Sequence, residues 1–210
     1  MRERCPRCLR SPPFCPCATL PRVETRTRVL LLQHPREARL AIGSAWLLKA
    51  GLAKVESYRA VRFADHERVR ALCAEPGAVL LAPGGAPAAA VPAAAPPPLL
   101  VVVDATWPQA EKMARANPWM DALPRVSVDA GRPSGYGDLR REPAPGFLPT
   151  VEAVAFALGA FDGAPERFDP MITAFQRAVA LQLEHARGEN RSPRHRPGAA
   201  ARRAGRVKAG

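Results

Sequence analysis

The chain of 210 residues has no apolar run that approaches the roughly 18 to 20 residues needed for a transmembrane helix. Its first residues, 1–6, also lack the apolar core of a secretory signal peptide. We therefore expect a cytoplasmic protein, in which thiols stay reduced. Hydrophobic residues still make up 47% of the chain, which is enough to build one domain with appendages.

Acidic residues are scarce at both ends of the chain. Residues 1–28 hold seven arginines and two acidic residues, and residues 187–210 hold eight basic residues and one acidic residue. Residues 29–186 hold 16 of each sign, so the net charge of +12 lies on the two terminal segments. This pattern favours basic arms that bind RNA or DNA. The alternative is a solubilising surface in an Arg-rich chain.

Cysteine is also scarce, and four of the five cysteines fall within the first 17 residues. Two close pairs separated by a short loop predict a structural zinc site with four thiolate ligands: Cys5, Cys8, Cys15 and Cys17. Disulfides do not suit a cytoplasmic chain, and a redox Cys-x-x-Cys would need a following helix that residues 9–13 do not favour. Arg4, Arg7 and Arg10 lie among the cysteines and could contact RNA phosphates. Cys73 has no partner nearby and is expected in the core.

The centre of the chain carries a strand, a carboxylate and a helix in succession. Residues 99–103 are apolar and rich in valine, which predicts a strand buried on both faces. Asp104 follows, and the Thr106-x-x-Gln109 pattern is a capping box for a helix that should end before Asn117 and its following proline. In open α/β sheets, ligands bind beyond the carboxyl ends of the strands. Asp104 therefore either performs chemistry there or only shapes the turn.

The remaining patterns alternate between short strands and helices, which predicts an α/β fold. We expect strands near 29–33, 54–61, 78–81 and 125–128, and helices over 43–51, 65–74, 150–161 and from 169 onward. Ser44 and Thr150 are the expected N-caps, and Gly51 the expected helix stop. The domains would then be a Cys-rich basic segment (1–28), a catalytic domain (29–186) and a disordered basic tail (187–210). Within the catalytic domain, residues 86–98, rich in Ala and Pro, should form an extended linker loop.

Three further segments carry weaker signals for a ligand site. Pro83 and Gly84 follow a predicted strand, where backbone amides can approach a ligand. Tyr136 with Arg140 and Arg141 could stack a base and hold a carboxylate or phosphate, or belong to an ordinary exposed loop. His34, after the first strand, could carry a proton, although a structural hydrogen-bonding role is favoured.

Five segments resemble, in this order, the DTW-domain family, which includes tRNA-uridine aminocarboxypropyltransferases. They are Cys5-x-x-Cys8…Cys15-x-Cys17, His34-Pro-x-Glu37, Asp104-Ala-Thr-Trp107, Ser134-x-Tyr136…Leu139-Arg140 and Thr150-Val-Glu-Ala153. The resemblance implies a SPOUT-like α/β fold with helices on both faces of the sheet and a knotted C-terminal half that binds S-adenosylmethionine. It also implies transfer of that molecule's 3-amino-3-carboxypropyl group to N3 of a tRNA uridine, with release of methylthioadenosine.

The resemblance assigns roles to particular residues of this chain. Asp104 would be the catalytic residue. The cofactor would be surrounded by Pro83, Gly84, Thr106, Trp107, Tyr136, Arg140, Arg141 and Thr150. The zinc segment and the basic arms would hold the tRNA, and no protein partner is implied. Two other functions stay open at this point: a non-catalytic, zinc-dependent RNA-binding module, and an RNA methyltransferase that uses the same cofactor.

Overall fold

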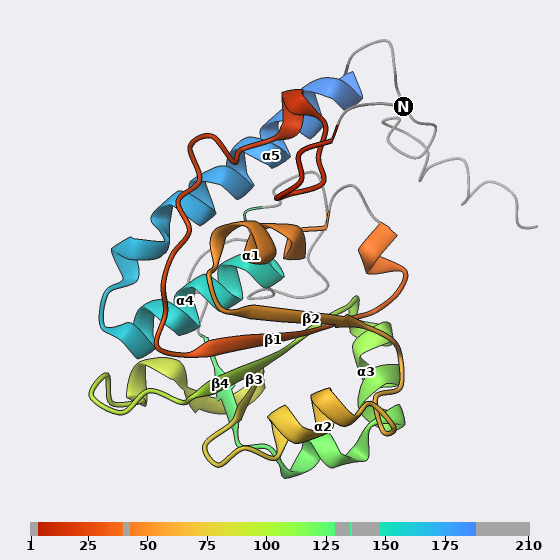
Figure 1. Cartoon of the computed structure of the whole chain (residues 1–210), viewed down its shortest axis with the longest axis vertical. Helices are drawn as coiled ribbons and strands as arrows, with labels where there is room; N and C mark the ends of the chain where they lie inside the picture. The colour runs from red at the N-terminus through yellow and green to blue at the C-terminus, as the bar shows by residue number, and fades with distance from the viewer. Residues whose placement is uncertain (1–3, 40–42, 129–134, 136–147, 188–210) are drawn as a thin grey trace, which may run out of the picture.

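A computed structural model describes residues 4–39, 43–128, 135 and 148–187 (Figure 1). Its strands are β1 (Arg28–Gln33), β2 (Val55–Arg59), β3 (Val79–Pro87), β4 (Leu99–Asp104) and β5 (Arg125–Ser127). Its α-helices are α1 (Ala45–Gly51), α2 (Glu67–Cys73), α3 (Trp107–Ala116), α4 (Thr150–Asp162) and α5 (Asp169–Arg187). Short 3₁₀ helices lie at Pro12–Phe14 (η1), Glu37–Arg39 (η2), Ala88–Ala90 (η3), Pro118–Ala122 (η4) and Pro165–Phe168 (η6). The predicted α/β fold is confirmed.

The strands form one parallel sheet in the order β2-β1-β4-β3-β5, with β4 at its centre. Both β1 and β4 are nearly continuous apolar runs, because a strand of a parallel sheet covered on both faces must bury every side chain. The register sets Gln33, the last residue of β1, beside Asp104, the last residue of β4. Two polar side chains therefore stand side by side where the two most buried strands end.

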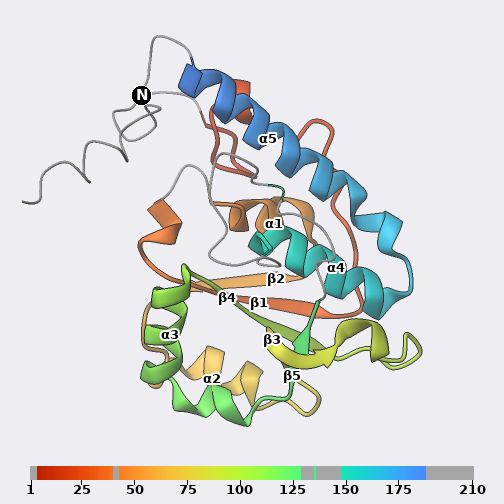
Figure 2. The same cartoon turned by 180° about the vertical axis from the view of Figure 1, so that it is seen from behind.

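Helices cover both faces of the sheet, as Figures 1 and 2 show. The α1, α4 and α5 helices pack on one face against alternate strand residues such as Leu31 and Val102. The α2 and α3 helices pack on the other face against Leu30 and Val101. The period-2 alternation of side chains along each strand divides the apolar residues between the two cores. Among the described helices, none combines the length and the apolar character needed to cross a bilayer.

Ser44 and Gly51, the expected N-cap and stop of α1, have other roles in the structure. Ser44 is the residue before α1, but its side chain caps nothing and instead accepts a hydrogen bond from the Val151 N–H at 3.3 Å. Gly51 is the last residue of α1 and not a left-handed stop, since its φ is not positive. Its missing side chain makes room for Met171 of α5, which lies 3.0 Å from where a Cβ would stand. Both residues therefore serve packing between α1 and the C-terminal helices.

The Ala/Pro-rich stretch is less of a linker than its composition indicates. Its first two residues, Ala86 and Pro87, end β3 and pair with β5. Ala88 is buried, and the Pro97 carbonyl accepts a hydrogen bond from the buried Thr27 hydroxyl at 2.7 Å. The stretch is thus anchored at these points, although most of its other residues are exposed. The basic tail begins at the end of α5, and residues 188–210, expected to be disordered, lie outside the described residues.

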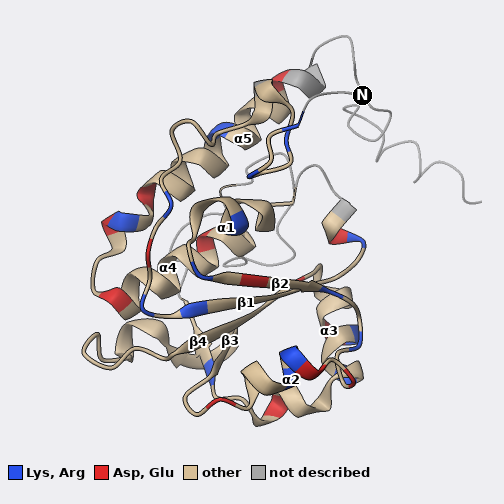
Figure 3. Ribbon diagram, viewed as in Figure 1, with Lys and Arg blue, Asp and Glu red and all other residues tan. Residues whose placement is uncertain are grey.

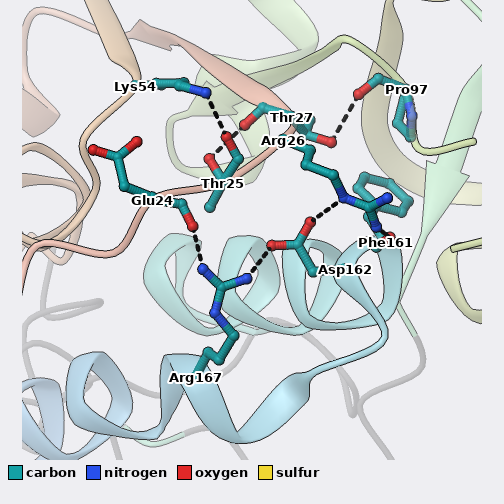
Figure 4. Close-up of polar contacts among 9 residues, drawn as sticks. All are labelled: Glu24, Thr25, Arg26, Thr27, Lys54, Pro97, Phe161, Asp162 and Arg167. Atoms are coloured by element: carbon teal, nitrogen blue, oxygen red, sulfur yellow. Dashed lines mark hydrogen bonds and ion pairs between the residues drawn. The ribbon is translucent and has the colours of Figure 1, made fainter. Parts of the chain in front are cut away.

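A buried carboxylate fastens the segment before β1 to the end of α4 (Figure 4). The Asp162 side chain is 3% exposed, and its two oxygens face Arg26 Nε at 3.5 Å and Arg167 Nη1 at 2.9 Å. Arg26 also donates to the Phe161 carbonyl at 3.1 Å, and Arg167 donates to the Glu24 carbonyl. Asp162 therefore ties η6 and the chain entering β1 to one helix end.

We expect Asp162→Asn to lower the free energy of unfolding by about 1–3 kcal/mol, because it removes the charge from a buried carboxylate that accepts a hydrogen bond from Arg167 and pairs with Arg26. The measurement is urea denaturation of the two proteins. Asp65→Asn is the matched control, since Asp65 pairs with Arg62 on the surface and its side chain is 82% exposed. Equal stabilities for the two variants would contradict the structural role of Asp162.

Candidate active site and metal centre

The adjacent strands β1 and β4 lead to helices on opposite faces of the sheet. The chain leaves β1 for α1 on one face and leaves β4 for α3 on the other. Because the two connections diverge, these strand ends form a topological switch point, and open α/β sheets bind ligands in the crevice expected there. Gln33 and Asp104 occupy the strand ends that border it.

Asp104 is 6% exposed and is held by two side chains. Gln33 Nε2 donates to its Oδ2 at 2.7 Å, and Thr150 Oγ1 donates to its Oδ1 at 2.7 Å. Both oxygens accept, as the oxygens of an ionised carboxylate do. Each oxygen keeps a second lone pair, so the group can still accept an N–H from a ligand. Asp104 is thus a fixed hydrogen-bond acceptor at the carboxyl end of β4.

Thr150 has a different role from the expected one. It is the first residue of α4 and not its cap, which is Pro149. Its hydroxyl reaches across 46 residues of sequence to Asp104. This bond directs the N-terminus of α4 toward the Asp104 carboxylate, and α3 begins three residues after Asp104. The positive ends of two helix dipoles therefore lie near this carboxylate and favour negative charge there.

Basic groups surround the same edge of the sheet. Burial lowers the pKa of Lys49 on α1, Arg59 lowers that pKa further, and Asp104 raises it. His34 is buried. Its ring Nδ1 accepts the backbone N–H of Arg36 at 3.2 Å, and its backbone N–H donates to the Asp104 backbone carbonyl at 2.9 Å. Burial, followed by Arg36 and Lys112, lowers the pKa of His34, which favours a neutral structural imidazole. Figure 3 shows blue segments just before η2, at the end of β2 and on α3 along this edge.

Thr106 and Trp107 begin α3 directly after Asp104 and Ala105. Thr106 is the N-cap of the predicted capping box, and its backbone N–H donates to Gln109 Oε1 at 2.9 Å. Trp107 is 45% exposed, which is unusual for so large an apolar side chain. An aromatic ring exposed next to a buried carboxylate offers a stacking surface to a planar ligand.

The other predicted ligand contacts are placed only in part. In β3, Leu81 pairs with Val102 of β4, and Pro83 and Gly84 come two and three residues later, near the level of Asp104. Gly84 has a φ of +74°, and a Cβ there would meet no atom within 4 Å, so the left-handed backbone and not crowding favours glycine. Tyr136, Arg140 and Arg141 lie outside the described residues.

Gln33 and Lys49 lie at the site but were not predicted from the sequence. Gln33 is a polar residue at the end of an otherwise apolar strand, and that signal could have been noticed, but its partner is set by the register of β1 on β4. Lys49 lies on a short helix whose position over the crevice depends on tertiary packing. Neither contact has a signature in the local sequence.

The four N-terminal cysteines converge as predicted. The sulfurs of Cys5, Cys8, Cys15 and Cys17 all lie within 4.8 Å of one another, and the Cys8 and Cys15 sulfurs are 3.6 Å apart. Four thiolates bound to one Zn²⁺ at about 2.3 Å lie roughly 3.8 Å apart, so the cluster has the size of a tetrahedral metal site. The N–H groups of Cys8 and Arg7 lower the pKa of Cys5 to about 6, while burial raises the pKa values of Cys8 and Cys17.

Arg7 and Arg10 attach the cysteine segment to the domain, which corrects the expectation that they face RNA. Arg7 Nε donates to the Ala50 carbonyl at 2.7 Å, and its two terminal nitrogens donate to the Cys17 and Pro21 carbonyls, each at 3.2 Å. The Arg10 guanidinium lies over the Trp46 ring, 4.7 Å from its centroid. The Arg7 charge is thus engaged with the end of α1 and the cysteine segment, because a guanidinium can serve several carbonyls at once, and Arg10 packs on the start of α1.

We expect Arg7→Ala to lower the unfolding free energy by about 1–3 kcal/mol, since three backbone carbonyls lose a charged donor. Arg7→Lys should recover little of this loss, because an ammonium cannot span three separate carbonyls. Thermal or urea unfolding measures the effect, with the exposed Arg62→Ala as control. Full recovery of stability by the lysine variant would overturn this assignment.

The fold and the site together define a class: an α/β protein with paired polar side chains at the switch point of a parallel sheet and a separate cluster of four cysteines. The DTW domain matches residues 2–183. The chain therefore belongs to the DTW domain family, and the resemblance drawn from the five motifs is confirmed.

Its relatives include proteins named tRNA-uridine aminocarboxypropyltransferase 2. The Drosophila melanogaster protein is 29% identical over 200 residues, which cover 91% of this chain and 79% of that protein. Those of Macaca fascicularis and Mus musculus are 25% and 24% identical, and each match covers 88% of this chain and 65% of the relative. No solved structure matches the chain.

Proposed function

We propose that this protein transfers the 3-amino-3-carboxypropyl group of S-adenosylmethionine to N3 of a uridine in tRNA. The observation that carries the proposal is a buried carboxylate held by two donors at the switch point, in a chain of the DTW family. The names of the relatives support a tRNA uridine as the substrate and aminocarboxypropyl as the transferred group. We further propose that the enzyme acts in the cytoplasm and that its domain has the SPOUT-like knot implied by the motifs.

The reaction forms a bond between uridine N3 and the γ-carbon of the donor. The carbon–sulfur bond breaks, its electron pair goes to the sulfonium, and methylthioadenosine leaves as a neutral thioether. The N3 proton must also leave, since N3 is a weak nucleophile while protonated. Asp104 accepts this proton or polarises the N–H as attack proceeds. Because the sulfonium already activates the carbon, most of the remaining task is orientation of the two substrates.

The residues around Asp104 supply that orientation. Thr150 and Gln33 fix the carboxylate, and the N-termini of α3 and α4 favour the donor's carboxylate or another anion in the crevice. Trp107 is exposed beside them and provides a face for adenine or the uracil ring. Thr106, Pro83 and Gly84 border the donor. The other contacts that the motif resemblance implies, Tyr136, Arg140 and Arg141, lie outside the described residues.

We also propose that the four-cysteine centre holds a structural Zn²⁺. The donor set supports zinc, since four sulfurs at this separation match its preferred ligands and geometry. When bound, the ion would cross-link a segment that has little core of its own. The cysteine segment and the basic ends of the chain would then bind tRNA phosphates, with Arg7 and Arg10 supporting the segment itself.

A double-label experiment tests the proposed reaction. The purified chain is incubated with tRNA and with S-adenosylmethionine that carries label either in the carboxyl group or in the methyl group. Carboxyl label in the RNA and methyl label in methylthioadenosine would support the transferase. Methyl label in the RNA would identify a methyltransferase instead, and RNA binding with no label in the RNA would identify a binding module.

A further inference from the structure

We infer that Gln33 is a positioning residue that couples the ligand to Asp104 through its amide: Nε2 holds the Asp104 carboxylate, and Oε1 accepts an N–H from the bound substrate. This inference rests on the proposed function and extends it to a residue that the motif resemblance does not assign. The evidence is the placement of the amide, its unfilled acceptor and its position at the crevice.

The amide has a defined orientation. Its Nε2 lies 2.7 Å from Asp104 Oδ2. The flipped amide would set two acceptor oxygens against each other, so the bond itself identifies which atom is nitrogen. Oε1 must then lie on the other side of the amide, away from that contact. The orientation of Gln33 is therefore fixed by the same carboxylate that it supports.

The Oε1 atom is buried and has no hydrogen-bond partner in the part of the chain that the structure describes. Gln33 as a whole is only 5% exposed, so the unfilled acceptor is shielded from bulk solvent. A buried acceptor left unpaired bears its full desolvation cost. The neighbouring acceptors are filled: Asp104 accepts two hydrogen bonds and the Ser44 hydroxyl accepts one. A ligand donor that reaches Oε1 removes the cost.

Two other buried side-chain atoms among the described residues lack such a partner, but neither lies on this carboxylate. Asp162 Oδ1 faces Arg26 Nε at 3.5 Å, and Trp119 Nε1 belongs to a ring under Arg70. Gln33 differs because it ends β1 beside Asp104, the last residue of β4. The connections that follow these two strands lead to opposite faces of the sheet. Its unfilled acceptor is therefore at the crevice where a ligand is expected.

The ligand group that suits Oε1 is an N–H donor. The proposed reaction brings two of them to the crevice: the imide N3–H of the uracil ring and the ammonium of the S-adenosylmethionine amino acid. An N–H bound to Oε1 would lie next to Asp104, because the two acceptors belong to neighbouring strand ends joined by one hydrogen bond. The amide would thus set the distance between the ligand and the carboxylate.

The test compares Gln33→Met and Gln33→Glu with the wild-type chain. Gln33→Met keeps the length of the side chain but removes both polar atoms, and we expect kcat/KM for tRNA to fall about 10- to 100-fold. Thr27→Val is the matched control, because it removes a buried hydrogen bond just before β1 without contacting Asp104. Activities are compared per folded protein, measured by thermal unfolding. Equal activity of Gln33→Met and the control would overturn the inference.

Gln33→Glu provides a readout that a purely structural role would not move. It keeps an acceptor but places a second carboxyl group within hydrogen-bond distance of Asp104, and two carboxylates in contact cannot both ionise easily. At low pH the shared proton replaces the Nε2–H, so activity should be partly retained and then fall as pH rises through the raised pKa of the pair. The pH profile of Gln33→Glu should therefore gain a descending limb. A profile parallel to that of the wild type would overturn the coupling.

Binding of S-adenosylmethionine without tRNA, measured by calorimetry, identifies which N–H group binds Gln33 Oε1. A weaker Kd in Gln33→Met would mean that the ammonium binds Oε1, and an unchanged Kd with a lower kcat/KM for tRNA would mean that the uracil N3–H does. Either result supports the inference, and no change in both quantities overturns it. If the wild-type chain transfers no label to tRNA, the proposed function fails, and the calorimetric comparison still decides whether Gln33 contacts the donor.

Discussion

Replacing Asp104 by asparagine is expected to lower kcat for aminocarboxypropyl transfer by about 100-fold or more, the lower end of the range for a general base. Asparagine has the same size, so the site keeps its shape. It loses the negative charge and one of the two acceptor oxygens that Gln33 and Thr150 now hold. N3–H of the uridine then lacks a group that can receive or polarise its proton. The measurement is single-turnover transfer of carboxyl label to tRNA.

The matched control for this variant is Asp121→Asn. Asp121 pairs with Arg125 on the surface, with its side chain 69% exposed, so its substitution makes the same charge change away from the crevice. We expect near wild-type transfer from this control. If Asp104→Asn also transfers at the wild-type rate while folded, Asp104 only shapes the turn after β4 and the proposed chemistry is wrong.

Replacing Cys8 by serine is the second change with a large expected effect. Cys8 is buried, and it belongs both to the four-sulfur cluster and to the core under α1. Structural Zn²⁺ in finger peptides binds with an apparent free energy on the order of 10 kcal/mol at pH 7, and that binding free energy is folding free energy. Losing one ligand should therefore cost several kcal/mol and reduce the zinc content. Metal analysis and urea unfolding measure the two effects.

Cys73→Ser separates loss of a ligand from loss of a buried thiol. Cys73 is also a free, buried cysteine, but it lies in the core of the α2 and α3 face, away from the cluster. We expect its substitution to leave the zinc content unchanged and to cost less stability. If protein purified without chelator contains no zinc, the proposed metal centre is wrong whatever the stability of the variants.

The course of the strands and helices was predictable because their signals are local. The valine-rich run before Asp104, the capping box at Thr106 and the proline after Asn117 bound β4 and α3 without tertiary information. The four cysteines were also predictable as a group, since their spacing alone brings two thiol pairs to one point. Each of these features depends only on residues that lie close together in the sequence.

The contacts that form the site depend on tertiary packing and could not be read from local patterns. Thr150 has the sequence environment of a helix cap, yet its hydroxyl binds Asp104 because α4 is packed over the end of β4. Gln33 reaches Asp104 through the register of two strands separated by some 70 residues of chain. Arg7 lies in a basic segment that favours phosphate contacts, but its guanidinium donates to three backbone carbonyls.

The most direct test of the central claim is mass spectrometry of nucleosides from tRNA incubated with S-adenosylmethionine and either the wild-type chain or Asp104→Asn. We predict that the wild-type reaction yields a uridine that carries the 3-amino-3-carboxypropyl group on N3, and that the Asp104→Asn reaction yields almost none. A methylated nucleoside in place of that product, or no modified uridine with any tRNA offered to the folded wild-type chain, would contradict the assignment.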